Sequence, residues 1–392
     1  WVDDKLKRAS VTIGSYIKSS YDLKTALMQL QLPPNCRLFT ADAQSMYTNI
    51  PTEFALAKIG QWLRANHNNF PDLPLQATID GLKCIMRHNY FIFGDTYWKQ
   101  LKGTAMGTPP APNYATLYYG IHEEDLMQQA QFKNNLLFYK RYIDDVFGIW
   151  CTTDPATDHI TWEAFKKFMN KRSFGLTWDH TPLSTSVDFL DITITLTEEN
   201  KIHTTLYEKS SNLHLYIPSH SAHPPGLIRG IVFGNIFRFH TLCSDEQDIL
   251  AKTRMFLHRL QARGYQRKEI LPLFHQAIQR AKSYTGPQPK ANKDMMGFML
   301  LHLQYHPQNP PGWELQKAWR DHIAHPDPPY GKPLSKIRIP FTGTPATRVG
   351  RTEMGIDRMI IAYSRAPNLG NLLSYRKLPS DHGPPASSFA NG

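Results

Sequence analysis

The chain has 392 residues, of which 44 are Lys or Arg and 33 are Asp or Glu, so its formal net charge is +11. Hydrophobic residues make up 41% of the sequence and aromatic residues 12%, a composition that excludes an intrinsically disordered chain. No stretch approaches the roughly eighteen uninterrupted apolar residues of a membrane-spanning helix. We therefore expect a globular protein of two or three domains with a sizeable core and no membrane partner.

The excess positive charge lies in the second half of the chain. Residues 1–199 contain 19 basic and 21 acidic residues, residues 200–284 contain 12 and 5, and residues 285–392 contain 13 and 7. This division suggests a nearly neutral core joined to a surface that binds a polyanion. Charge alone leaves open the alternative of an ordinary basic surface exposed to water.

Hydrophobic periodicity predicts the elements of the first 130 residues. A helix is expected over residues 10–31, followed by a short strand over residues 37–41 that carries Asp42 at its end. Further helices are expected over residues 52–65, 75–88 and 113–129. Between the last two lie an aromatic hairpin turning at Gly94-Asp95 and a Gly/Pro-rich loop over residues 103–112.

The second half begins with strands and ends with helices. Strands are predicted over residues 136–139 and 146–150, on either side of Asp144 and Asp145, and a helix follows at residues 162–171. Three more strands are predicted after this helix, over residues 175–179, 187–196 and 201–208. Ser244 and Gln247 form a capping-box pattern before a helix that stops at Gly264, and a last helix covers residues 268–282. The four cysteines lack any CxxC or zinc spacing, and we expect them to be reduced in an intracellular compartment.

Three aspartates form the strongest chemical pattern. Asp144 and Asp145 lie in a tight turn between two predicted strands, where their carboxylates repel each other unless cations lie between them. Asp42 ends another predicted strand. Carboxylates from neighbouring strand ends can hold two ions about 4 Å apart, the arrangement used in phosphoryl transfer. The alternative is that Asp144 and Asp145 belong to an ordinary polar turn and that Asp42 is a capping or turn residue.

The segments around these aspartates resemble the motifs of a known enzyme family. Residues 39–51, with the sequence FTADAQSMYTNIP, resemble motif A of reverse transcriptases. Residues 103–109 (GTAMGTP) resemble motif B, and residues 142–145 (YIDD) resemble motif C, in the family's order. The resemblance is closest to the reverse transcriptases of Penelope-like retroelements, which are related to telomerase. It continues at residues 189–192, 221–224, 236–238 and 365–373.

The resemblance implies an α+β right-hand polymerase fold, with a palm of antiparallel sheet and packed helices and a helical thumb. The implied domains are an N-terminal helical segment (1–35), the palm (36–208), a basic helical thumb (209–285) and a Pro-rich C-terminal extension or linker (286–392). It also implies that the chain begins after most of the fingers, and that it either stops short of a GIY-YIG endonuclease or belongs to an element that lacks one. The 392 residues are therefore expected to be a fragment of a longer retrotransposon protein.

The activity implied by the resemblance is that of an RNA-directed DNA polymerase, a nucleotidyltransferase located in the nucleus. It would add deoxynucleoside triphosphates to a DNA primer on an RNA template with two Mg²⁺ or Mn²⁺ ions. Asp42, Asp144 and Asp145 would bind the metals. Ala43 and Tyr47 would contact the nucleotide, Tyr47 as a steric gate against a ribose hydroxyl, although a buried core tyrosine is the alternative. The motif B residues implied to line the nucleotide site are Gly103, Met106, Gly107, Thr108 and Pro109.

Two further assignments concern later parts of the chain. His180 lies on the strand after the Asp-Asp turn, where related enzymes place a general acid for pyrophosphate departure. A surface histidine with no role is the alternative. The hairpin of residues 187–208 is expected to hold the primer end. Nucleic-acid phosphates are expected to contact basic residues of the thumb, namely Arg238, Lys252, Arg254, Arg259 and Arg263.

Two other classes of protein remain as alternatives. A catalytically inactive or domesticated reverse-transcriptase-like protein would bind nucleic acid without synthesis. A nuclease with an aspartate-bound metal ranks last, because Tyr47 and the loop at residues 103–109 have no place in its mechanism.

Overall fold

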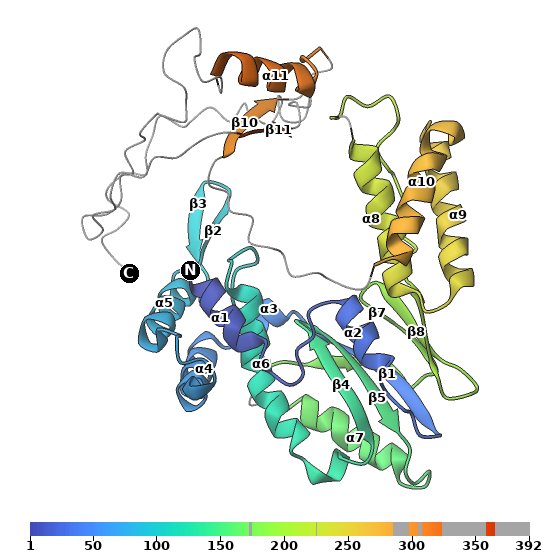
Figure 1. Ribbon diagram of the computed structural model, residues 1–392. Coiled ribbons are helices and arrows are strands. Elements are labelled where there is room, and N and C mark those ends of the chain that lie inside the picture. The colour runs from blue at the N-terminus through green and yellow to red at the C-terminus, as the bar shows by residue number, and fades with distance from the viewer. Residues whose placement is uncertain (172–174, 225, 285–297, 305–307, 324–357, 365–392) are drawn as a thin grey trace, which may run out of the picture. The chain divides into compact units, whose positions relative to one another are not determined.

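The computed structural model describes residues 1–171, 175–224, 226–284, 298–304, 308–323 and 358–364 (Figure 1). The chain divides into two compact units, the first comprising residues 1–215 and 235–259 and the second residues 216–234 and 260–392. This division differs from the four predicted domains, because residues 235–259 of the predicted thumb belong to the first unit. The motif at residues 365–373 and most of the Pro-rich extension lie outside the described residues. No helix in the described ranges is long and apolar enough to cross a membrane.

The first unit contains a four-stranded antiparallel sheet with the order β4-β5-β1-β6. Its strands are β4 (Leu136–Tyr142), β5 (Asp145–Cys151), β1 (Cys36–Ala43) and β6 (Trp178–His180). The antiparallel sheet expected around the aspartates is thus confirmed. Because side chains alternate between the two faces of a strand, the register of β1 decides what each face carries. Asp42 lies opposite Asp145 on one side and Asp179 on the other.

Two helices cover the face of this sheet that is opposite to Asp42 and Asp145 (Figure 1). In α7 (Asp158–Met169), the ring of Trp162 lies 5.0 Å from that of Phe39 on β1. In α6 (Ala111–Met127), the ring of Tyr119 lies 4.6 Å from that of Trp178 on β6. Helices α1 (Val2–Ser10) and α4 (Thr52–Ala65) pack against α6, and α5 (Leu75–Arg87) packs against α1 and α4, so a continuous apolar core lies behind the face with the aspartates.

The helix predicted over residues 10–31 forms only in part. Helix α1 ends at Ser10 and α2 covers Ser20–Leu27, and Ser19 caps α2 by accepting a hydrogen bond from the backbone N–H of Asp22. The segment between them runs beside β4. Arg141 N–H donates to the Ser15 carbonyl at 2.7 Å, and Ile17 N–H donates to the Arg141 carbonyl at 3.1 Å. Pairing with a strand therefore takes precedence over the local helical pattern.

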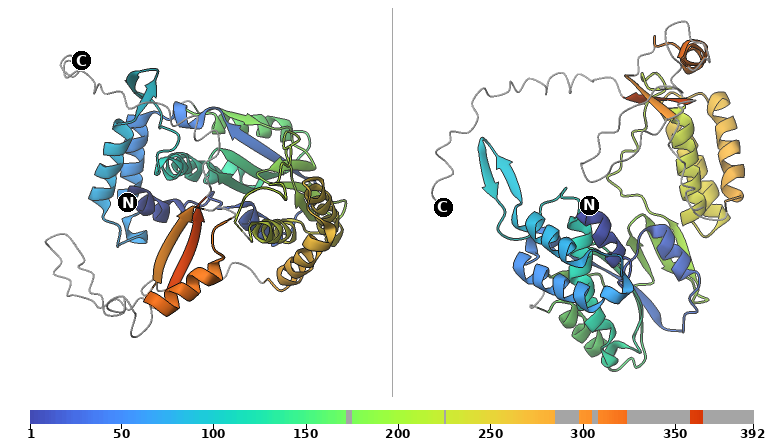
Figure 2. Two further views of the ribbon diagram at one scale, coloured as in Figure 1. Left: turned by 90° about the horizontal axis from the view of Figure 1, so that it is seen from above. Right: turned by 60° about the vertical axis from the view of Figure 1, so that its left-hand side comes forward.

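Short elements connect these layers. They are α3 (Met46–Asn49), the 3₁₀ turns η1 (His67–Asn69) and η2 (Ala130–Phe132), and the hairpin of β2 (Tyr90–Phe93) and β3 (Thr96–Lys99). The predicted hairpin is confirmed and extends away from the helices (Figure 2). All eight residues of its two strands are exposed.

A second sheet of the first unit has three antiparallel strands, β7 (Ser186–Phe189), β8 (Ile192–Leu196) and β9 (Ile202–Leu206). The single strand predicted over residues 187–196 is wrong, because the chain folds back at Leu190 and Asp191. Leu190 has a φ of +53°, a left-handed conformation that ends the strand. The ring of Phe189 lies 5.8 Å from that of Phe147 on β5. This sheet therefore lies on the face of β5 that also carries Asp145.

Three helices follow, α8 (Leu227–Leu242), α9 (Glu246–Ala262) and α10 (Arg267–Lys282). The sequence patterns predicted α9 and α10 but missed α8, whose apolar residues surround the helix rather than forming one stripe. The predicted capping box is also wrong. The Asp245 carboxylate accepts from Gln247 N–H at 2.7 Å, whereas the Ser244 hydroxyl pairs with the backbone of Thr204. The second unit adds a parallel pair, β10 (Phe298–Gln304) and β11 (Arg358–Ser364), the helix α11 (Gly312–Ala318) and a π turn η4 (Trp319–Ile323).

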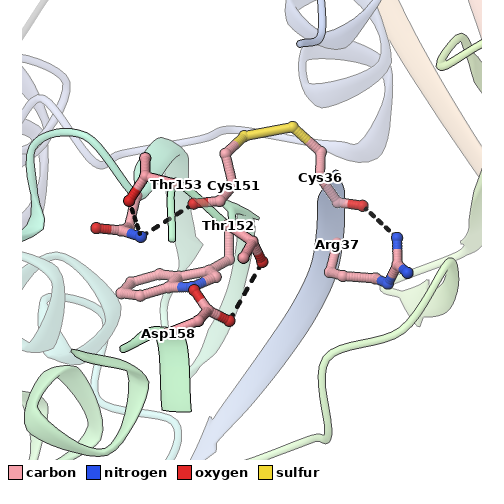
Figure 3. The surroundings of a disulfide bond; sticks show 8 residues. Cys36, Arg37, Cys151, Thr152, Thr153 and Asp158 are labelled. Carbon is pink, nitrogen blue, oxygen red and sulfur yellow. Dashed lines mark hydrogen bonds between the residues drawn. A yellow bond between two sulfur atoms is a disulfide. The ribbon is translucent and has the colours of Figure 1, made fainter. Parts of the chain in front are cut away.

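A disulfide joins Cys36 and Cys151, which face each other across β1 and β5 (Figure 3). The Asn135 side chain donates to the Cys151 carbonyl at 3.0 Å beside it. The disulfide lies at the end of the strand pair away from Asp42 and Asp145. It differs from the reduced cysteines expected from sequence, while Cys84 is free and exposed.

Candidate active site

The three predicted metal ligands lie at one end of the central sheet. Asp42 on β1 is directly opposite Asp145 on β5, so both project from the same face. Asp144 occupies the two-residue turn between β4 and β5, and its carbonyl accepts a hydrogen bond of 3.0 Å from Ala43 N–H. Ile143, the other turn residue, has a φ of +54°, which is costly for a β-branched side chain. The sheet register thus brings Asp42 beside Asp144 and Asp145, which are 102 and 103 positions away in the sequence.

The carboxylates of this group repel one another. Burial, together with the charges of Asp144 and Asp42, raises the pKa of Asp145 to about 6, and Lys209 opposes the rise. Burial likewise raises the pKa of Asp42, with additional repulsion from Asp144 and Asp179. Bringing a cation to these oxygens would relieve the repulsion.

The donor set suits a hard divalent cation. Carboxylate and carbonyl oxygens are the ligands that Mg²⁺ prefers, and a cation beside Asp42 and Asp145 would offset the repulsion that contributes, after burial, to their raised pKa values. As the described residues stand, no three carboxylate, imidazole or thiol groups converge closely enough to hold a metal ion. The fit to Mg²⁺ therefore rests on the donor chemistry, and metal binding stays a prediction.

Asp179 is an acid of this face that sequence reasoning missed. It lies opposite Asp42 on β6, is exposed, and accepts a hydrogen bond of 2.7 Å from the Gln44 side chain. The strand pattern around residue 178 held the signal. Trp178 is buried in the core, so its neighbour Asp179 must point to the opposite face, where Asp42 lies.

The structure does not support His180 as the general acid. His180 pairs with Ala41, so its ring lies on the core face of the sheet, opposite to that of Asp42. There it lies edge-on to Trp162 at 5.9 Å, and its Nε2 is 3.2 Å from the Met169 sulfur. Burial lowers its pKa to about 4, so at pH 7 the imidazole is neutral and is not the protonated imidazolium that a general acid requires. On β6 the preceding residue, Asp179, lies on the face of Asp42, whereas His180 lies on the core face.

Tyr47 lies on α3 beside the aspartates. Its side chain is half-buried and packs against the core. Burial raises its pKa, and the charges of Asp144 and Tyr142 add to the rise, which places the phenol close to the turn. This position agrees with the predicted gate and also with a partly buried core residue, so the role of Tyr47 stays a prediction.

The loop at residues 103–109 is attached to the turn after β1. Thr104 N–H donates to the Tyr47 carbonyl at 2.7 Å, and Gly103 N–H donates to the Ile50 carbonyl at 3.1 Å. Gly103 has a φ of +79°, and a Cβ there would collide with the Tyr47 carbonyl oxygen and with Thr48. Gly103 is therefore needed because the backbone of Tyr47 and Thr48 approaches it closely. The sequence had suggested a different reason, the close approach of a nucleotide.

The remaining residues of this loop are more open. Met106 is 79% exposed, Gly107 and Pro109 are exposed, and Thr108 is half-buried. Gly107 has a φ of +93° with open space around it, so it could accept a ligand nearby without a steric conflict.

Four of the five predicted phosphate-binding residues have partners within the protein. Arg238 pairs with Asp191 at 2.8 Å, and Arg263 donates to the Tyr216 carbonyl at 2.6 Å. Lys252 and Arg259 both pair with Glu208, at 3.3 and 2.5 Å. Arg254 is exposed, and within the described residues it forms no ion pair. Exposure therefore favours Arg254 among the five as a phosphate contact.

A family model described as an animal helix-turn-helix domain matches residues 215–275. The match includes α8, α9 and the start of α10, and it covers less than half of the chain. No curated protein sequence matches the chain.

Several solved polymerase structures are similar to the chain. Telomerase from Candida albicans, in complex with a TWJ fragment of telomeric RNA, is 11% identical with a TM-score of 0.46, and the match covers 71% of this chain and 48% of the telomerase chain. Apo telomerase from Candida tropicalis is 11% identical with a TM-score of 0.41, covering 71% and 53%. The Sicinivirus 3Dpol RNA-dependent RNA polymerase is 14% identical with a TM-score of 0.37, covering 62% and 52%. The chain thus spans about half the length of these proteins. This level of similarity assigns no family to it.

Proposed function

We propose that the chain is part of an RNA-directed DNA polymerase of the Penelope-like retroelement kind. One observation carries the proposal. Asp42 and Asp145 lie opposite each other on neighbouring antiparallel strands, and Asp144 lies in the adjoining turn. These are the three positions that the resemblance to motifs A and C assigns to metal ligands.

The chemistry would follow from this placement. Two divalent cations held by Asp42, Asp144 and Asp145, with the Ala43 carbonyl as a further ligand, would stabilise charge on the attacking and leaving oxygens of nucleotidyl transfer. The hydrogen bond between Thr104 N–H and the Tyr47 carbonyl holds the loop at residues 103–109 next to Tyr47. A nucleotide bound beside the acids would therefore contact both the loop and Tyr47. The Tyr47 ring would favour deoxynucleotides by excluding a ribose hydroxyl.

The primer and template would lie on the adjoining elements. The three-stranded sheet β7–β9 touches β5 on the face of the acids, which supports its assignment to the primer end. The helix-turn-helix match and the basic excess after residue 199 support nucleic-acid binding by residues 215–275. A nuclear location would follow from the function of a retroelement polymerase.

The proposal predicts loss of synthesis when a metal ligand is neutralised. Primer extension on an RNA template with deoxynucleoside triphosphates and Mg²⁺ should fall by about 100-fold or more in Asp144→Asn and in Asp42→Asn, because each change removes a charged metal ligand. Asp95→Asn, at the exposed tip of the β2–β3 hairpin, removes one charge elsewhere and should leave synthesis unchanged. Undiminished synthesis in Asp144→Asn or Asp42→Asn would refute the two-metal assignment.

The gate is tested separately. Tyr47→Ala should raise the incorporation of ribonucleotides relative to deoxynucleotides in the same assay. No rise would make Tyr47 a core residue.

Nucleic-acid binding without catalysis is the second candidate function. It is favoured by the helix-turn-helix match and by the lack, among the residues that the structure describes, of a converged metal-binding cluster. It predicts that the protein binds an RNA–DNA hybrid with an affinity that falls steeply with salt, and that wild type and Asp144→Asn are equally unable to extend a primer.

A further inference from the structure

A buried ion pair lies behind the turn that carries Asp144. Arg141, the penultimate residue of β4, and Glu123 of α6 have side chains that are each 1% exposed. The Arg141 Nε is 2.7 Å from Glu123 Oε1, and its Nη2 is 2.8 Å from Oε2, so the guanidinium binds the carboxylate with two parallel hydrogen bonds.

The same guanidinium reaches the turn itself. Its Nη1 donates to the Ile143 carbonyl at 2.7 Å, and its Nη2 also donates to the Thr116 carbonyl of α6 at 2.9 Å. The Ile143 carbonyl belongs to the peptide that joins Ile143 to Asp144. Because peptides are planar, holding this carbonyl also holds the backbone N–H and Cα of Asp144. Arg141 thus connects the rigid helix α6 to the backbone of a metal-binding candidate.

The turn needs such support. Ile143 adopts a φ of +54°, a conformation that costs a β-branched residue of order 1–3 kcal/mol and persists only when its surroundings impose it. The opposite side of the turn is held by the bond between Ala43 N–H and the Asp144 carbonyl. The Arg141 contact supplies the restraint on the Ile143 side.

The ion pair is itself fully supported. The Tyr139 hydroxyl donates to Glu123 Oε1 at 2.6 Å, and the Ser15 hydroxyl donates to Oε2. Buried charges are costly unless they are paired and hydrogen-bonded, and here the carboxylate accepts four hydrogen bonds while the guanidinium donates four. Only a guanidinium spreads its N–H groups over three nitrogens, which lets it reach the carboxylate, the Thr116 carbonyl and the Ile143 carbonyl at once, so lysine cannot replace it.

We propose that Arg141 is a positioning residue that holds the Ile143–Asp144 peptide so that the Asp144 and Asp145 carboxylates face Asp42. The inference rests on the proposed function for the meaning of that arrangement. Arg141 itself touches neither nucleotide nor metal and acts through the turn.

Two variants and a control test this role. Arg141→Lys keeps the buried positive charge but loses the contact with the Ile143 carbonyl. The double variant Arg141→Met with Glu123→Leu removes the charges together, and replacing a buried ion pair by apolar residues of similar volume is often tolerated by the fold. Tyr139→Phe is the matched control, because it removes a hydrogen bond from the same carboxylate and leaves the contact between Arg141 and Ile143 intact.

Two measurements on the full chain separate positioning from general stability. Hydrogen exchange at the backbone amides of residues 142–147 should accelerate by about tenfold in both Arg141 variants and remain near wild type in Tyr139→Phe. Binding of Mn²⁺, followed by the loss of its free electron paramagnetic resonance signal, should weaken by about 10- to 100-fold in the Arg141 variants, the usual effect of removing support for a metal ligand.

Each outcome decides the question. Unchanged exchange at the turn in the folded Arg141 variants would overturn the proposal, and so would an equal effect of Tyr139→Phe on exchange or on Mn²⁺ affinity. Mn²⁺ binding that stays at the wild-type affinity when the turn is loosened would also overturn it. If the wild-type chain binds no Mn²⁺, the proposed function fails, and hydrogen exchange alone then shows whether Arg141 holds the turn.

Discussion

Neutralising Asp145 should make the metal-free protein more stable. Burial, Asp144 and Asp42 raise the pKa of Asp145 from 3.8 to about 6, so its ionised form costs the folded state free energy. The change corresponds to about 3 kcal/mol for full ionisation. Because the carboxylate is only half-buried, screening by water halves this to about 1.5 kcal/mol. We therefore expect Asp145→Asn to raise the free energy of unfolding by about 1.5 kcal/mol at pH 8.

The sign of the pH dependence follows from the raised pKa. Between about pH 4 and pH 6 the folded protein binds a proton at Asp145 that the unfolded chain has already lost, so wild-type stability falls as the pH rises through this window. Below it both states are protonated, and above it both are ionised and the full cost is present. The advantage of Asp145→Asn should thus be near zero at pH 4, grow up to about pH 6 and stay constant at higher pH.

Urea unfolding in buffer with a chelator, at pH 4 and pH 8, measures this difference directly. Asp95→Asn, at an exposed hairpin tip, controls for the loss of one negative charge and should change the free energy of unfolding by less than about 0.5 kcal/mol at either pH. A variant Asp145→Asn that is no more stable than wild type at pH 8, or whose advantage is the same at both pH values, would refute the reasoning. A confirmed gain would show an acid retained for function at a cost in stability.

Two further predictions concern the backbone around the site. Cys151→Ser opens a disulfide between residues separated by 115 positions and should lower the free energy of unfolding by about 2–5 kcal/mol in urea, whereas the exposed, free Cys84→Ser should change it by less than about 0.5 kcal/mol; equal stability of both variants would mean that the disulfide contributes nothing. Gly103→Ala should cost about 2–4 kcal/mol, because its Cβ would collide with the Tyr47 carbonyl oxygen at a φ of +79°. Gly107→Ala, at a φ of +93° with open space, should cost only about 1 kcal/mol, and equal losses would contradict the close approach.

Local sequence patterns predicted many of the elements. Helix α4 has the predicted bounds, residues 52–65, and the aromatic hairpin turns at Gly94 and Asp95 as expected. Such elements form wherever periodicity and end signals agree. Residues 15–17 pair with the distant strand β4, which interrupts the helix predicted over residues 10–31. The strand predicted over residues 187–196 is divided by a local turn at Leu190 and Asp191, where Leu190 has a φ of +53°.

The sequence also predicted that Asp42, Asp144 and Asp145 lie together, but it did not predict that Asp179 joins them and that His180 does not. Asp144 and Asp145 are adjacent, and Asp42 ends an apolar stretch, so their approach could be expected from strand topology. The choice between Asp179 and His180 depends on the register of β6 against β1. A shift of one residue exchanges the two faces of a strand, and no local signal records that register.

The charge division shows the same limit. The sequence alone established that the excess of basic residues follows residue 199. Counting charges cannot show that Glu208 binds both Lys252 and Arg259, or that Arg238 is paired with Asp191, because these contacts join residues from different elements. Among the five predicted phosphate contacts, Arg254 is exposed and forms no ion pair in the described ranges, and the binding of phosphate by all five stays a prediction.

The sequence by itself determined a globular chain, the local elements with strong periodicity and an ordered set of acids next to strands. The tertiary structure alone decided that Cys36 faces Cys151, that Asp179 shares the face of Asp42, and that Arg141 joins α6 to the Asp144 turn. Local preferences act over a few neighbouring residues, whereas these contacts depend on the register of strands and the packing of helices far apart in the chain.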